Sequence, residues 1–160
     1  MTRLFKIIAS IALLAVAASC SDLLFEDRDQ IYDGPPVVEF GPTLPAGSYS
    51  QSVTFPADSD QSTTVSIRVN YIAAPPESSI NGSFQVSGGD AVDGTHYSLP
   101  EGTTFTIPAG ENSTDIQVQL LGSGLSNGES VSLTLELQEG QDYEVSANYK
   151  EFQISASKES

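Results

Sequence analysis

The stretch Val65-Ser66-Ile67-Arg68-Val69-Asn70-Tyr71 decides the fold class of this chain, because apolar and polar residues alternate through it without interruption. Alternation with a period of two places every apolar side chain on one face of an extended strand and every polar side chain on the other. The same pattern runs through residues 116–120 and 131–137. Each of these segments is therefore predicted to be a strand that buries one face.

Shorter alternating runs extend the pattern to about eight strands, and no window after the N-terminal region has a sustained helical period. The shorter runs lie at residues 38–40, 53–55, 84–86, 105–107 and 152–154. Residues typical of turns separate the runs, namely Pro75-Pro76, Asn81-Gly82, Gly88-Gly89, Pro108-Ala109-Gly110 and Asn127-Gly128. Many short one-sided strands pack as two sheets around one core. The sequence thus predicts an all-β fold: a single immunoglobulin-like antiparallel β-sandwich of about seven to eight strands over residues 37–157.

One region has a sequence motif that is more specific than a general β-strand pattern. It comprises Asp93-Gly94-Thr95-His96-Tyr97-Ser98-Leu99-Pro100, then residues 104–111 with their Pro108-Ala109-Gly110 turn, then residues 113–118. Residues 62–138 around it resemble the Calx-beta domain, in the version found in uncharacterised lipoproteins of the Bacteroidota. The resemblance implies the Calx-beta sandwich. The chemistry of the residue itself predicts that Tyr97 buries its ring and keeps its hydroxyl at the edge of the sandwich.

The resemblance also bears on calcium. Calx-beta domains that bind calcium use the aspartate of a Gly-x-Asp-Tyr turn and an acid-rich loop after the strand that follows the Pro-x-Gly turn. Here the aspartate position is His96, and the corresponding loop, residues 121–129, has Glu129 as its single carboxylate. Asp90, Asp93 and Glu39 remain as oxygen donors, whereas calcium takes six to eight oxygens. We therefore expect the sandwich to be kept and the metal site to be lost.

The N-terminus resembles a bacterial lipoprotein signal peptide. Arg3 and Lys6 precede an apolar stretch that ends in Ala17-Ala18-Ser19, and Cys20 follows directly. This is a lipobox-like sequence with alanine where leucine is usual. It predicts a signal peptide over residues 1–19 and lipidation of Cys20, the only cysteine. The alternatives are a simple cleaved signal, which would leave a lone thiol outside the cytoplasm, and an uncleaved anchor, for which the apolar stretch is short.

Residues 20–36 are predicted to be the lipidated cysteine and an acidic flexible tether that ends in Gly34-Pro35-Pro36. Asp22 and Glu26, close to Cys20, resemble the acidic signal that directs Bacteroidota lipoproteins to the outer face of the outer membrane. The sequence therefore predicts a protein attached to the outer membrane through lipid and exposed at the cell surface.

Charge excludes one class of partner. After removal of the signal peptide, four basic residues remain against 21 acidic ones, which gives a net charge of −17. Such a charge repels nucleic acid and anionic lipid headgroups. The expected partners are the membrane, through the lipid on Cys20, and a protein or glycan that the sequence does not specify.

Few residues suggest chemistry. His96 is the only histidine, and with Asp90 and Asp93 it forms a weak candidate cluster for a divalent cation. Gly124-Leu125-Ser126-Asn127-Gly128 has the spacing of a Gly-x-Ser-x-Gly motif, but the alternating run at residues 131–137 predicts a strand after it, where a nucleophile elbow needs a helix. No enzyme and no cofactor are therefore expected. The tyrosines at positions 32, 49, 143 and 149 lie outside the clearest strands and are candidates for stacking on sugar rings. The sequence favours a non-catalytic envelope module with a structural or interaction role, with a calcium-binding Calx-beta-type module and a glycan-binding accessory to polysaccharide uptake as alternatives.

Overall fold

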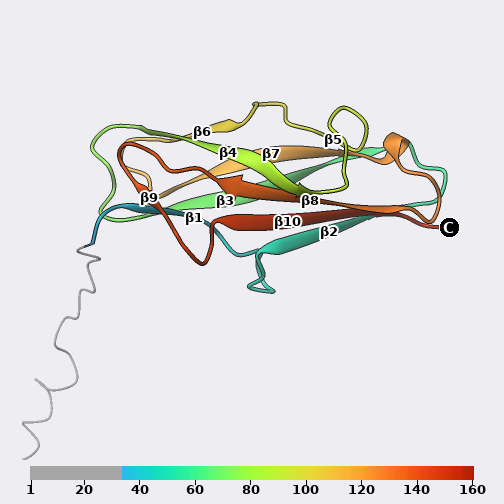
Figure 1. Ribbon diagram of the computed structural model, residues 1–160, viewed down its shortest axis with the longest axis horizontal. Coiled ribbons are helices and arrows are strands. Elements are labelled where there is room, and N and C mark those ends of the chain that lie inside the picture. Colours follow the sequence, from blue (N-terminus) through green and yellow to red (C-terminus); the bar gives the residue numbers. More distant parts are fainter. Residues whose placement is uncertain (1–33) are drawn as a thin grey trace, which may run out of the picture. The chain divides into compact units, whose positions relative to one another are not determined.

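The structure, a computed structural model, describes residues 34–160. The predicted signal peptide, Cys20 and the tether up to residue 33, with Tyr32 in it, lie outside the described residues. Ten strands and one turn of 3-10 helix follow in chain order (Figure 1): β1 Val37–Phe40, β2 Ser50–Phe55, β3 Ser62–Ile72, β4 Ile80–Gly89, β5 Tyr97–Ser98, β6 Thr104–Ile107, β7 Ser113–Leu121, η1 Gly122–Gly124, β8 Ser130–Leu137, β9 Glu144–Val145 and β10 Glu151–Lys158.

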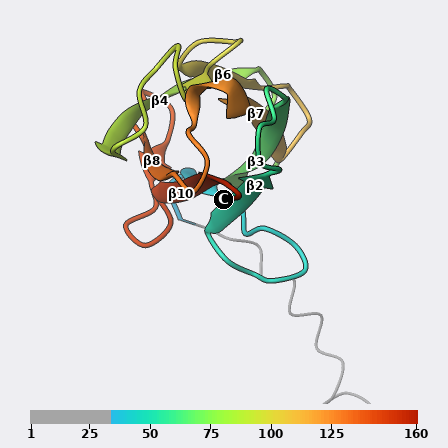
Figure 2. The same ribbon diagram turned by 90° about the vertical axis from the view of Figure 1, so that its right-hand side faces the viewer.

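The strands form two five-stranded sheets that face each other across one core. One sheet has the order β5-β7-β3-β1-β9 and the other has the order β2-β10-β8-β4-β6. Viewed from the end in Figure 2, the two sheets curl around a common interior. This arrangement confirms the predicted all-β sandwich. Within residues 34–160 no helix is long and apolar enough to cross a membrane.

The prediction of a purely antiparallel sandwich is wrong at two strand pairs. β1 pairs with β9 in parallel, with Val38 opposite Val145, and β2 pairs with β10 in parallel, with Val53 opposite Ala156. In the second pair, β2 lies beside β10 because the chain changes from one sheet to the other through residues 41–49. Parallel partners must be joined by a long connection, so runs of local sequence do not reveal them.

All eight predicted strands are present, and four details differ from the sequence-based expectation. β5 and β9 were not predicted, because two residues are too few to show a period. Asn81-Gly82 and Gly88-Gly89, predicted as turns, lie inside β4. There Gly82 is required by packing, since a Cβ at this position would lie 2.2 Å from the Phe105 ring.

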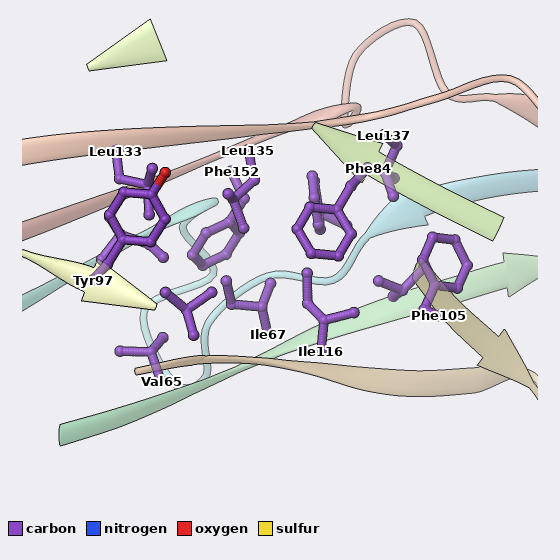
Figure 3. Packing of buried hydrophobic residues seen from close by; sticks show 14 of the residues in the cluster. Val65, Ile67, Phe84, Tyr97, Phe105, Ile116, Leu133, Leu135, Leu137 and Phe152 are labelled. Atoms are coloured by element: carbon purple, nitrogen blue, oxygen red, sulfur yellow. The ribbon is translucent and has the colours of Figure 1, made fainter. Parts of the chain in front are cut away.

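Alternate residues of the long strands fill the core, as the period of two predicted. The pattern is complete in β8, where Val131, Leu133, Leu135 and Leu137 are all buried. Figure 3 shows the side chains of both sheets meeting, with the Tyr97 ring among them. Tyr97 is 5% exposed, which confirms that its ring is buried. Val86 departs from the pattern at 38% exposure, because β6 covers only Ile80–Ser83 of β4.

The sandwich has two distinct ends. At the proximal end, Val37 of β1 lies opposite Ile72 of β3, and Pro36 accepts a hydrogen bond from the Glu144 amide. The distal end is formed by three loops, residues 56–61, 90–96 and 122–129 (Figure 1, right). The eleven residues of β3 run from one end to the other, a distance of about 33 Å at the usual rise per residue.

Candidate functional site

The distal loops bring together two of the three predicted cation ligands with a residue from another loop. Asp90 and His96 lie in the loop between β4 and β5, while Glu129 lies between β7 and β8. The two loops pack closely, since a Cβ at Gly124 would lie 1.9 Å from the Thr95 carbonyl oxygen. Calx-beta domains that bind calcium do so between the equivalent loops, so this end is the first candidate site.

At the distal end, Asp90 hydrogen-bonds to β8 and Glu129 hydrogen-bonds to its own loop. Asp90 Oδ1 accepts hydrogen bonds from the Ser132 amide at 2.6 Å and from the Ser132 hydroxyl at 3.1 Å. Glu129 Oε2 accepts one from the Ser126 amide at 2.7 Å. These donors hold the pKa of both carboxyl groups below its ordinary value. A carboxyl group whose pKa is lower in the folded state stabilises the fold at pH values above the ordinary carboxyl pKa. This stabilisation is lost as the pH falls through the lowered pKa.

The other candidate ligands do not complete a metal site within the described residues. His96 Nδ1 accepts a hydrogen bond from the Val92 amide at 2.9 Å. The β-bridge between Asp93 and Tyr97 involves the backbone and not the Asp93 carboxylate. Glu39 lies opposite Asn70 on β1, in the proximal half, where Ser146 and Asn70 hydrogen-bond to it. Across residues 34–160, no group of three or more histidine, cysteine, aspartate or glutamate side chains is placed to hold a metal ion.

We expect the melting temperature of the domain to change by less than about 1 °C between millimolar calcium and a chelator, because the loop carboxylates are already used in hydrogen bonds. A site of micromolar affinity would instead stabilise the domain by about 4 kcal/mol at a thousandfold excess of calcium, which corresponds to a shift of several degrees. Thermal unfolding followed by circular dichroism measures the difference. A shift of that size, lost on replacing Asp90 and Asp93 by Asn, would contradict the expectation.

A second candidate surface joins tyrosines from distant parts of the sequence. The rings of Tyr49 and Tyr149 stack at a centroid distance of 4.5 Å and an interplanar angle of 17°. Burial, Tyr149 and the Glu39 carboxylate raise the pKa of Tyr49. Tyr49 also packs against the core, while Tyr149 is 39% exposed. The pair therefore offers one ring face to solvent, and Tyr143, at 5% exposure, offers none.

A third feature is a polar groove of about 490 Å³ at the proximal end. It is lined by Gln85, Glu136, Leu137, Gln138, Glu139, Val145, Ala147 and Lys150. Glu136 accepts hydrogen bonds from Lys150 Nζ at 2.8 Å and from Gln85 Nε2 at 3.0 Å. Both bonds lower the pKa of Glu136, with Lys150 the larger cause, and Glu136 in turn raises the pKa of Lys150. Glu136 and Lys150 thus neutralise each other, and Glu139 is the remaining charged residue of the groove.

The tyrosine pair and the groove could not be predicted from the sequence. Positions 49 and 149 are separated by most of the domain, and Gln85 meets Glu136 only because β4 pairs with β8. For the distal end, the Calx-beta resemblance gave the signal, and the structure places the two loops that it named side by side. The resemblance did not indicate that Asp90 hydrogen-bonds to Ser132 of β8 or that Glu129 hydrogen-bonds to Ser126 of its own loop.

Together, the sheet order, the buried Tyr97 and the paired distal loops define a Calx-beta-like β-sandwich. Comparison with solved structures supports this class. The apo form of the Calx CBD1 domain superposes with a TM-score of 0.52 and 12% identity, over 79% of this chain and 100% of that domain. No protein-family model and no curated protein matches the chain.

Bacteroides proteins give similar superpositions. A protein of unknown function from Bacteroides ovatus has a TM-score of 0.55 and 18% identity, over 74% of this chain and 43% of that protein. EndoBT-3987 of Bacteroides thetaiotamicron, solved with Man5GlcNAc product, has a TM-score of 0.54 and 8% identity, over 71% of this chain and 29% of that protein. The present chain thus spans less than half the length of either protein, and identities this low show the fold alone.

Proposed function

We propose that this chain is a non-catalytic, lipid-anchored module of the bacterial outer membrane that interacts with a partner at the cell surface. The observation that carries the proposal is the end of the sandwich at which β1, the first described strand, begins. β1 begins at the proximal end, so a lipid on Cys20 would tether that end. The distal loops, about 33 Å away along β3, would then face outward.

The side-chain chemistry of the described residues supports a role without catalysis. The ring of His96, the only histidine, accepts a hydrogen bond from the backbone. The three basic residues of the domain have partners: Arg68 lies 3.4 Å from Asp115, Lys150 pairs with Glu136, and Lys158 donates to the Leu125 carbonyl at 2.9 Å. An interaction role needs no reactive group, and a charged, soluble sandwich suits it.

Simple binding assays distinguish two alternative functions from this proposal. A calcium-binding Calx-beta-type module would use the distal loops, and the calcium melt described above tests it. A glycan-binding accessory to polysaccharide uptake would use the exposed face of Tyr149, whose ring stacks on Tyr49. A single exposed ring face is a small stacking platform, which ranks the glycan role below a protein partner.

Replacement of Cys20 by Ala is expected to move the protein from the membrane fraction to the soluble fraction, because the acyl chains on this thiol supply the membrane affinity. Fractionation and labelled fatty acid uptake in the native host measure the effect, and Ser19→Ala provides a matched control that keeps the thiol. Surface exposure is measured separately by protease treatment of intact cells. A Cys20→Ala protein that stays membrane-bound, with a wild type that incorporates no fatty acid, would refute the anchor.

A further inference from the structure

An uncharged stretch of this acidic domain contains an open sheet edge. No charged residue occurs from Gly41 to Ala57, the stretch that contains β2. β2 is an edge strand of its sheet. Within residues 34–160 its one neighbouring strand is β10, with which it pairs along all six residues. The opposite edge of β2 faces away from the sheet.

The hydrogen bonds show which backbone groups point outward. The carbonyls of Tyr49 and Phe55 accept from the amides of Gln153 and Glu159, so the odd-numbered positions face β10. The backbone amides and carbonyls of the even-numbered residues therefore point outward, since the direction of these groups alternates along a strand. Of these, the Ser50 carbonyl accepts hydrogen bonds from the hydroxyls of Thr43 and Ser48. Ser52 and Thr54 thus present two amide donors and two carbonyl acceptors on a side where no strand of the described residues lies.

Proteins usually protect such edges with short strands, charges, prolines or bulges. The other strands that end a sheet here are short: β5 and β9 have two residues each, and β6 has four. β2 is longer, contains no charge or proline, and keeps a continuous register with β10. An unprotected edge of this kind is suited to pairing with another strand.

Acidic residues stand at both ends of this edge and restrict the partner. Asp58 and Asp60 follow β2, and Glu159 bonds to Phe55 at the same end. At the other end, Glu151 lies just before Gln153, the residue opposite Ser50. Two of the basic residues are paired with other carboxylates, Arg68 with Asp115 and Lys150 with Glu136. Lys158 lies opposite Phe55 and donates to the Leu125 carbonyl, so it offsets only one of the three carboxylates at that end. The edge is therefore neutral in the middle and negative at both ends.

We propose that the outer edge of β2 binds an extended segment of a partner protein, which adds to the sheet as a further strand. The segment has an uncharged β-forming middle and basic residues at both ends, so that main-chain hydrogen bonds supply affinity and charge supplies selectivity. A second copy of this chain fits poorly, because antiparallel pairing of two β2 strands would bring the acidic ends of both copies together. The inference rests on the proposed interaction role and names its surface and the class of its partner.

The test uses residues 34–160, whose core is self-contained, and a peptide as probe: Lys-Lys-Thr-Val-Thr-Val-Thr-Lys-Lys. We expect saturable shifts of the Ser52 and Thr54 amide signals in NMR spectra and slower hydrogen exchange at both. Ser52→Pro removes one outward donor without removing a bond to β10, and it should weaken binding about tenfold or more, the loss of about one hydrogen bond. Ser52→Ala keeps the amide and should bind like the wild type.

The role of charge is tested with the same peptide carrying Glu in place of Lys, which should not bind. Added salt should weaken the binding of the Lys peptide. Equal binding by the Ser52→Pro variant, equal binding of the Glu peptide, or shifts confined to other strands would overturn the proposal. If Ser52→Pro lowers the melting temperature strongly, Thr54→Pro replaces it.

Two further results would also overturn the proposal by identifying another occupant. Self-association in sedimentation that Ser52→Pro abolishes would assign the edge to a second copy. Binding by residues 34–160 that is lost in residues 21–160 would assign it to the chain's own N-terminal segment. Since no lipid is present in these assays, a negative result leaves the membrane anchor unaffected, and the Cys20→Ala experiment tests that separately.

Discussion

Replacement of Leu133 by Asp is expected to abolish folding of the domain. Leu133 is 1% exposed and lies on β8 between Ile154 of β10 and Gly89 of β4; Figure 3 shows it beside the Tyr97 ring. Truncation of a buried leucine to alanine alone destabilises by about 2–5 kcal/mol, and an unpaired buried carboxylate adds a large desolvation penalty. Together these approach the whole stability of a small domain, about 5–15 kcal/mol.

The measurement is thermal unfolding of the soluble domain by circular dichroism, in which the Leu133→Asp variant should show no cooperative transition. Thr134→Asp is the matched control, because Thr134 is the next residue of β8 and points to the other face, where it is partly exposed. Its effect should stay within about 0.5 kcal/mol, as is usual at surface sites. Similar behaviour of the two variants would mean that the buried face of β8 is assigned incorrectly.

Replacement of Gly89 by Ala should give the second largest loss of stability, about 2–5 kcal/mol. Gly89 has a φ of +101°, and a Cβ there would lie 2.2 Å from the Ser132 carbonyl oxygen. A left-handed backbone costs a non-glycine residue about 1–2 kcal/mol, and forcing extra atoms into a packed site costs about 1–3 kcal/mol. Because Asp90 bonds to the Ser132 amide, the displacement also reaches the distal loops.

The control is Gly110→Ala, which separates backbone strain from the clash. Gly110 also has a positive φ, +80°, but no atom lies within 4 Å of a Cβ built there. This variant should lose only the strain energy of about 1–2 kcal/mol. Melting temperatures measure both, with a decrease on the order of 10 °C or more expected for Gly89→Ala. A larger decrease for Gly110→Ala would show that β4 and β8 do not approach each other as closely as described.

Local sequence determined the fold class, because period-two alternation is a property of each strand by itself. The runs at residues 65–71, 116–120 and 131–137 bury the side chains that the alternation assigned to the core. The short motif from Asp93 to Pro100 also indicated the Calx-beta type, since turn geometry depends on a few neighbouring residues. The strong negative charge, which limits the possible partners, is likewise a property of composition.

The candidate surfaces were decided by the tertiary structure, because each joins residues that are distant in sequence. Asp90 stands near Glu129 only after β4 and β8 pair, and Tyr49 meets Tyr149 only after the chain changes sheets between β1 and β2. The open edge of β2 follows from the same change, which places β2 beside β10 with nothing beyond it in the described chain. Sequence alternation states which face of a strand is buried, but strand order depends on the packing of the whole core, and strand order decides which edges and loops are available for binding.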